Sequence, residues 1–78
     1  MMRLQYKGES FGATGLKNGS IYACLGVEYG LLRVIDESGD DYLYSAQNPV
    51  PIDGTSKGGI WEIIEDDDNG TLRKAING

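Results

Sequence analysis

Residues 20–45 read SIYACLGVEYGLLRVIDESGDDYLYS. This stretch holds three short apolar runs, separated by two turn sequences, Tyr29-Gly30 and residues 37–40. Runs of this length, bounded by Gly, Asp and Ser, are typical of antiparallel strands joined by tight hairpins. The sequence therefore predicts a three-stranded meander, with strands over residues 20–28, 31–36 and 41–45.

The first of these runs does not reveal which of its faces is buried. Ile21 and Leu25 lie on one face and Tyr22 and Cys24 on the other, and both faces are largely apolar. Alternation therefore does not tell the core side from the solvent side. Because the chain contains no histidine that could activate Cys24, we expect this thiol to be buried and structural.

The segment before the meander is predicted to be a short strand followed by a long loop. The strand covers residues 3–7 and ends at Gly8. The loop, residues 8–19, is rich in glycine, and Phe11 and Leu16 are its expected anchors to the core.

The segment after the meander begins with a crossing loop over residues 46–59, which contains two prolines and three glycines. Proline cannot donate a ladder hydrogen bond, so this loop interrupts the sheet. A strand is predicted over residues 60–65, and residues 71–76 form either a last strand or one helical turn. Trp61 and Val34 lie in the middle of strands and are expected in the core.

Composition excludes several classes of function. The 78 residues form one domain (1–78) with 7 basic and 12 acidic side chains, a net charge of −5, no histidine and one cysteine. An acidic chain does not suit the nucleic-acid backbone, and histidine is the commonest general base and metal ligand. We therefore expect no nucleic-acid partner, no cofactor and no enzymatic activity.

Location is predicted from what the sequence lacks. No apolar run reaches the roughly 20 residues of a membrane span or the roughly 7–15 of a secretory signal. One cysteine also fits a reducing compartment. We expect a cytoplasmic protein that does not engage a membrane.

The acidic turn over residues 65–70 invites comparison with a calcium loop. Aligning Gly70 with the sixth position of an EF-hand loop places Glu65, Asp67 and Asn69 at the first, third and fifth. The twelfth position, which requires a bidentate Glu, is then Ile76. The sequence therefore predicts a solvated acidic turn and no metal site.

A second acidic group lies around the turn between the last two strands of the meander: Asp36, Glu37, Asp40 and Asp41. Acid–base chemistry by paired carboxylates needs at least one of them buried, and a turn tip is usually the least buried place in a small domain. These carboxylates are therefore expected to face solvent and to have no catalytic role.

This acidic hairpin is the candidate interaction surface. Residues 28–68 hold eleven of the twelve acidic residues and two of the seven basic ones, a net charge of −9. Such a surface attracts cationic partners, although it also serves solubility. Nearby tyrosines either pack across strands or contribute to an interface. The candidate partner-binding residues are Glu37, Asp40, Asp41, Tyr42 and Tyr44.

The predicted order of strand, long loop, meander, crossing loop and strand resembles that of SH3-like small barrels. More narrowly, the chain resembles short SH3-like small-barrel proteins of Gram-positive bacteria and their mobile elements. The similar segments, spread over residues 4–65, are YKG at 6–8, LKNGSIY at 16–22, RVID at 33–36 and DYLY at 41–44.

The resemblance implies an all-β, SH3-like barrel of about five strands. In SH3 domains generally, peptides dock between the first long loop and the next hairpin turn, which would be residues 8–19 and 28–30 here. We therefore expect a small interaction module that binds a basic protein or peptide through its acidic, tyrosine-containing surface. The alternatives are an accessory structural subunit and, less favoured, a small carboxylate-dependent enzyme.

Overall fold

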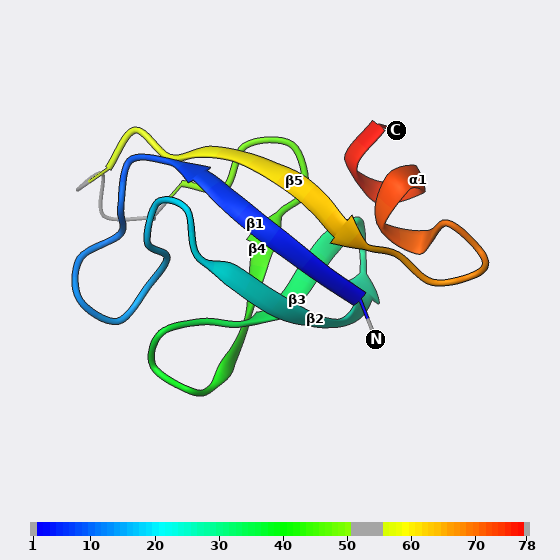
Figure 1. Cartoon of the computed structure of the whole chain (residues 1–78), viewed down its shortest axis with the longest axis horizontal. Helices are drawn as coiled ribbons and strands as arrows, with labels where there is room; N and C mark the ends of the chain where they lie inside the picture. The colour runs from blue at the N-terminus through cyan, green and yellow to red at the C-terminus, as the bar shows by residue number, and fades with distance from the viewer. Residues whose placement is uncertain (1, 51–55, 78) are drawn as a thin grey trace.

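The computed structural model of the chain describes residues 2–50 and 56–77 as five strands and one helix (Figure 1). The strands are β1 Met2–Gly8, β2 Ile21–Glu28, β3 Leu31–Ile35, β4 Asp41–Ser45 and β5 Gly59–Glu65, and the helix is α1 Thr71–Asn77. The predicted meander is confirmed, with strand ends within one residue of the expected ones. Of the predicted crossing loop, residues 51–55 lie outside the described residues.

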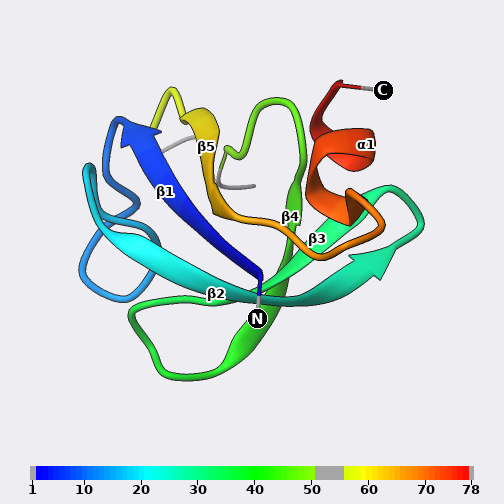
Figure 2. The same cartoon turned by 45° about the vertical axis from the view of Figure 1, so that its right-hand side comes forward.

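The five strands of the described residues form one antiparallel sheet in the order β4-β3-β2-β1-β5. Figure 2 shows β2 as a long, curved strand between the β1–β5 pair and the β3–β4 hairpin. The end strands β4 and β5 do not pair within residues 2–50 and 56–77, so the sheet is not closed. One side chain links them, because the Trp61 indole Nε1–H donates to the Ser45 carbonyl at 3.0 Å.

The buried face of β2 is the one that carries Tyr22 and Cys24. Both side chains are buried, whereas Ile21 and Leu25 are 53% and 55% exposed. The Cys24 thiol donates to a backbone carbonyl at 3.3 Å, and burial raises its pKa, so the expectation of a buried thiol is confirmed.

Cross-strand partners select this face. Tyr22 lies opposite Leu4 and Cys24 lies opposite Val34, and both partners are fully buried. The register of β2 against β3 shifts between Cys24 and Gly26, as it does at a β-bulge. The simple alternation expected from the sequence therefore ends before the strand does.

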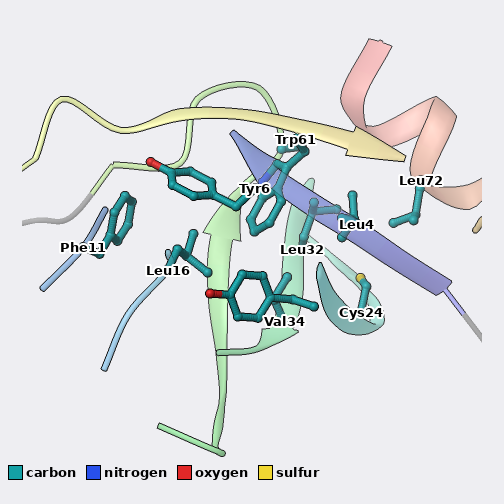
Figure 3. Packing of buried hydrophobic residues seen from close by; sticks show 11 residues of the cluster. Leu4, Tyr6, Phe11, Leu16, Cys24, Leu32, Val34, Trp61 and Leu72 are labelled. Atoms are coloured by element: carbon teal, nitrogen blue, oxygen red, sulfur yellow. The ribbon is translucent and has the colours of Figure 1, made fainter. Parts of the chain in front are cut away.

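The hydrophobic core lies inside the curl of the sheet. Figure 3 shows side chains converging there from β1, β5 and the meander, with Leu72 reaching in from α1. The expected core positions of Trp61 (5% exposed) and Val34 (0%) are confirmed, and Phe11 and Leu16 anchor the long loop as predicted. The buried cluster comprises Leu4, Tyr6, Phe11, Leu16, Tyr22, Cys24, Leu32, Val34, Ala46, Trp61 and Leu72.

β1 and β5 come closest where two glycines face each other. Gly8 pairs with Gly59, and a Cβ on Gly8 would lie 2.5 Å from the Gly59 Cα. The φ of Gly8 is 155°, which side-chain-bearing residues rarely adopt. Glycine is therefore required at this end of β1, where the chain leaves the sheet for the long loop.

The helix resolves the alternative that the sequence left open for residues 71–76. Two carboxylates of the preceding turn cap its first backbone N–H groups. Asp66 accepts from the N–H groups of Leu72 and Arg73 at 2.9 and 3.1 Å. Asp67 accepts from the N–H of Thr71 at 2.9 Å and from its hydroxyl at 2.5 Å. The acidic turn therefore starts a helix, whose Leu72 is fully buried.

This capping makes the stability of the helix depend on pH. Desolvation raises the pKa of Asp66, but bonds from three backbone N–H groups outweigh it, and the net pKa is lowered. The pKa of Asp67 is lowered mainly by the hydroxyl and N–H of Thr71. A carboxylate with a lowered pKa in the folded state stabilises the fold above its unfolded pKa of about 3.9. That stabilisation is lost as the pH falls through the folded pKa.

We therefore expect the double variant Asp66→Asn and Asp67→Asn to have a weaker pH dependence of stability than the native chain. Thermal unfolding between pH 7 and pH 2.5, followed by circular dichroism, measures this difference. The control is Asp68→Asn, which removes a charge from the same turn at an exposed side chain. Identical pH profiles for the native chain and the double variant would contradict the capping role.

Candidate functional site

The five candidate residues lie together on the β3–β4 hairpin, where four of them are exposed and Tyr44 is half-buried. The turn between the strands is closed by two backbone bonds, from Asp36 N–H to Asp40 O (3.2 Å) and from Gly39 N–H to Asp36 O (3.1 Å). Gly39 has a φ of 88°, which suits the left-handed position of a three-residue hairpin loop. Around this turn, three of the five candidates are engaged within the molecule.

Glu37 ties the hairpin to the long loop. Its carboxylate accepts the Tyr22 hydroxyl at 2.6 Å and lies 4.0 Å from the Lys17 ammonium. The Tyr22 hydroxyl in turn accepts the Lys17 backbone N–H at 2.8 Å, and Glu37 N–H donates to the Gly15 carbonyl at 3.0 Å. Burial and the bond to Glu37 raise the pKa of Tyr22. Glu37 therefore holds the β3–β4 turn against the long loop and β2, and its side chain is only 29% exposed.

Tyr44 is half-buried and packs against the core. Its ring packs against Phe11 at a centroid distance of 5.9 Å and edge-on against Trp61 at 6.2 Å. Its hydroxyl donates to Asp36 Oδ2 at 2.6 Å. Burial, followed by this bond to Asp36, raises the pKa of Tyr44. Of the two alternatives for this tyrosine, packing is therefore the observed one.

Asp36 is buried, although the sequence predicted a solvent-facing carboxylate at this position. The expectation that all the turn carboxylates face solvent is wrong for this one, which is only 8% exposed. Besides Tyr44, it accepts the backbone N–H of Ser38 at 2.9 Å and the Ser38 hydroxyl at 2.5 Å. An Asp two residues before a Ser at the end of a strand signals this kind of turn. The signal does not reveal the bond to Tyr44.

Asp41 lies in a charge cluster on the outer face of the sheet. Arg33 donates through Nη1 to Asp41 at 2.9 Å and through Nε and Nη2 to Glu28 at 2.5 and 3.1 Å. The bond to Arg33 lowers the pKa of Glu28. Arg33 lies opposite Gly26, which has no side chain. One oxygen of the Asp41 carboxylate is thus bound by Arg33, and the side chain remains 42% exposed.

Asp40 and Tyr42 are the exposed candidates whose side chains make no hydrogen bond or ion pair among the described residues. Asp40 is exposed, and within residues 2–50 and 56–77 its carboxylate makes no hydrogen bond or ion pair. Tyr42 is 52% exposed and lies opposite Val34, on the same face of β4 as Tyr44. These two side chains are therefore available to a partner.

The comparisons with known proteins add no further residue. The chain matches no protein-family model, no curated protein and no solved structure. In the described part of the chain, no group of three or more His, Cys, Asp or Glu residues is placed to hold a metal ion. Within the described residues, no helix is long and apolar enough to cross a membrane, because α1 has only seven residues.

The two segments of the docking region that the SH3 resemblance implies lie on either side of β2 along the chain. Residues 8–19 precede β2 and residues 28–30 follow it, and Figure 2 shows them at opposite ends of that strand. The long loop instead contacts the β3–β4 turn through Gly15 and Lys17. Tyr29, at the tip of the other turn, is 98% exposed with a φ of 55°. The long loop is therefore held against the acidic hairpin.

Proposed function

We propose that the chain is an SH3-like small barrel that acts as a protein-interaction module and not as an enzyme. The observed order of strand, long loop, meander, crossing segment and strand supports this fold. The Trp61 indole, which joins β5 to Ser45 at the end of β4, supports it further. The similarity to small-barrel proteins of Gram-positive bacteria and their mobile elements is part of the proposal, as is a cytoplasmic location, which suits a buried free thiol.

The observation that carries the proposal is an exposed Asp40–Tyr42 pair on a firmly held hairpin. Glu37, Asp41 and Asp36 are each bonded to a tyrosine or an arginine of the same chain. These bonds fix the hairpin before a partner arrives, so little ordering entropy is lost on binding. The arrangement suits a recognition surface better than a catalytic one, because the buried carboxylate is fully occupied by its own neighbours.

Charge complementarity indicates the class of partner. The hairpin and its surroundings lie within the segment 28–68, which has a net charge of −9. Asp40 projects this charge outward with no cation bound to it among the described residues. Opposite charges across an interface raise the association rate more than the affinity. The partner is therefore a protein or peptide with basic side chains.

We expect Asp40→Asn to slow association with a basic partner several-fold at low ionic strength and to leave the fold intact. Partners captured from the native host would be mixed with each variant by stopped flow at two ionic strengths. The matched control is Asp68→Asn, which removes the same charge from the other acidic turn. Rates insensitive to both salt and Asp40→Asn would mean that the acidic surface serves only solubility.

A further inference from the structure

The outer edge of β4 offers unpaired backbone groups, because β4 is one end of the described sheet. The Asp36 N–H donates to the Asp40 carbonyl, so that pair is hydrogen-bonded. Hydrogen-bonded and non-hydrogen-bonded pairs alternate along an antiparallel ladder. In the observed register, Tyr42 and Tyr44 therefore bond to β3. The outward-facing N–H and C=O groups belong to Asp41, Leu43 and Ser45.

The chain itself uses only part of this edge. The Ser45 carbonyl accepts the Trp61 indole N–H, which confirms that Ser45 faces away from β3. Within residues 2–50 and 56–77, no hydrogen bond occupies the outward backbone groups of Asp41 or Leu43. The other end strand is engaged at its start, where the Gly59 N–H donates to the Pro49 carbonyl at 3.3 Å. The first half of β4 is therefore a free edge of the described sheet.

Of the side chains that usually block an exposed edge, this half of β4 has one carboxylate, Asp41, and no lysine or proline. Exposed edges are usually blocked by lysine, proline or a bulge, and the β4 sequence DYLYS contains neither residue. Leu43 is 38% exposed on one face and Tyr42 is 52% exposed on the other. The carboxylates of Asp40 and Asp41 lie at the beginning of the strand. An incoming strand would thus meet apolar surface followed by negative charge.

We infer that β4 binds an extended, basic segment of a partner protein by antiparallel strand addition. Backbone bonds to Asp41 and Leu43 supply the contact, an apolar residue lies opposite Leu43, and basic residues lie opposite Asp41 and Asp40. This inference rests on the proposed function and specifies how the acidic hairpin recognises its partner. The partner's segment would read, from its N-terminus, apolar, β-branched, basic, basic.

The test uses a synthetic peptide with blocked ends, Thr-Val-Leu-Val-Lys-Lys, which follows this pattern from Ser45 to Asp40. It would be titrated into the full chain at low salt while amide chemical shifts are recorded by NMR. Saturable shifts are expected at the amides of Asp41 and Leu43. The charge control, Thr-Val-Leu-Val-Glu-Glu, is expected to bind more weakly by roughly tenfold or more, since like charges would then face each other.

Two N-methylated peptides separate strand addition from simple charge attraction. Methylating the leucine nitrogen removes the N–H that faces Leu43, and it should weaken binding by roughly tenfold or more. Methylating the second valine, opposite Tyr42, alters an N–H that points away from β4. That peptide should bind about as tightly as the parent. Both peptides keep the same charge and composition, so only the hydrogen-bonding edge differs between them.

Every remaining outcome contradicts the inference, and the outcomes can be told apart. If the two methylated peptides bind equally well while the glutamate peptide does not bind, strand addition is wrong and the charged surface of the proposed function stands. If the lysine and glutamate peptides bind alike, the charge basis of both proposals is wrong. No shift at Asp41 and Leu43 at millimolar peptide would refute the site. Shifts that follow protein concentration would instead assign this edge to a second copy of the chain.

Discussion

Trp61→Ala should lower the free energy of unfolding by about 3–5 kcal/mol, the usual range for removing a buried tryptophan. Trp61 is 5% exposed and contacts the rings of Tyr6 and Tyr44 edge-on, at centroid distances of 5.7 and 6.2 Å. Its indole N–H also binds the Ser45 carbonyl, which joins the two end strands. A loss of this size is a large part of the about 5–15 kcal/mol that stabilises a typical domain.

Urea unfolding followed by circular dichroism measures this effect, because the variant has lost its only tryptophan fluorophore. The matched control is Ile60→Ala on the same strand, where the side chain is 59% exposed. That substitution should change the stability by less than about 1 kcal/mol. A Trp61→Ala protein that melts within a few degrees of the native one would contradict the role of Trp61 as the bridge between β4 and β5.

The strands were predictable because their signals are local. Two-residue and four-residue turn sequences separate the apolar runs of the meander, and Tyr29 and Gly30 adopt the left-handed conformations of a tight hairpin turn. The buried face of β2 was not predictable in this way. It depends on the partners Leu4 and Val34, which come from other strands, and on the register shift between Cys24 and Gly26.

The start of the helix and the burial of Asp36 were harder to predict, because both depend on hydrogen bonds between side chains and groups several residues away. The acidic turn suggested a solvated loop, yet Asp66 and Asp67 use their oxygens to start α1. Exposure of Asp40 and Tyr42 was predictable, because Asp40 lies in a surface turn and Tyr42 lies on a strand at the end of the sheet. Burial of Asp36 was not, because it requires the hydroxyl of Tyr44 to reach back across the hairpin. The exposure of the hairpin tip was therefore predictable from the sequence, whereas the bonds that hold the hairpin were not.

The second substitution expected to cause a large loss of stability is at Asp36, because three hydrogen bonds of the hairpin end on its carboxylate. Replacing Asp36 by Ala removes the acceptor for the Tyr44 hydroxyl and for two donors of the exposed Ser38. The bond from the Tyr44 hydroxyl to a charged group contributes about 1.5–3 kcal/mol, and the hydroxyl left without a partner adds a desolvation cost. The two donors of Ser38 add little, because this exposed residue can bond to water instead. We therefore expect Asp36→Ala to lower the free energy of unfolding by about 2–4 kcal/mol.

A double-mutant cycle assigns this loss to the bond between the two side chains. Tyr44→Phe keeps the ring against Phe11 and Trp61 but deletes the hydroxyl, so it should cost less than Asp36→Ala. Combined in one chain, the two substitutions should cost less than the sum of their separate effects, with a coupling of about 1 kcal/mol or more. Asp40→Ala, four residues away and exposed, should stay within about 0.5 kcal/mol of the native stability.

The same cycle decides whether the hairpin is held in shape for recognition. If the Tyr44–Asp36 bond fixes the hairpin, Tyr44→Phe should speed amide hydrogen exchange at Ser38 and Gly39, because both belong to the turn that Asp36 organises. Exchange at Leu4 of β1, on the far side of β2, should stay as in the native chain. Additive costs together with unchanged exchange in the turn would show that Asp36 stabilises the core without rigidifying the acidic surface. The Tyr44–Asp36 bond would then not hold Asp40 and Tyr42 in place before a partner binds.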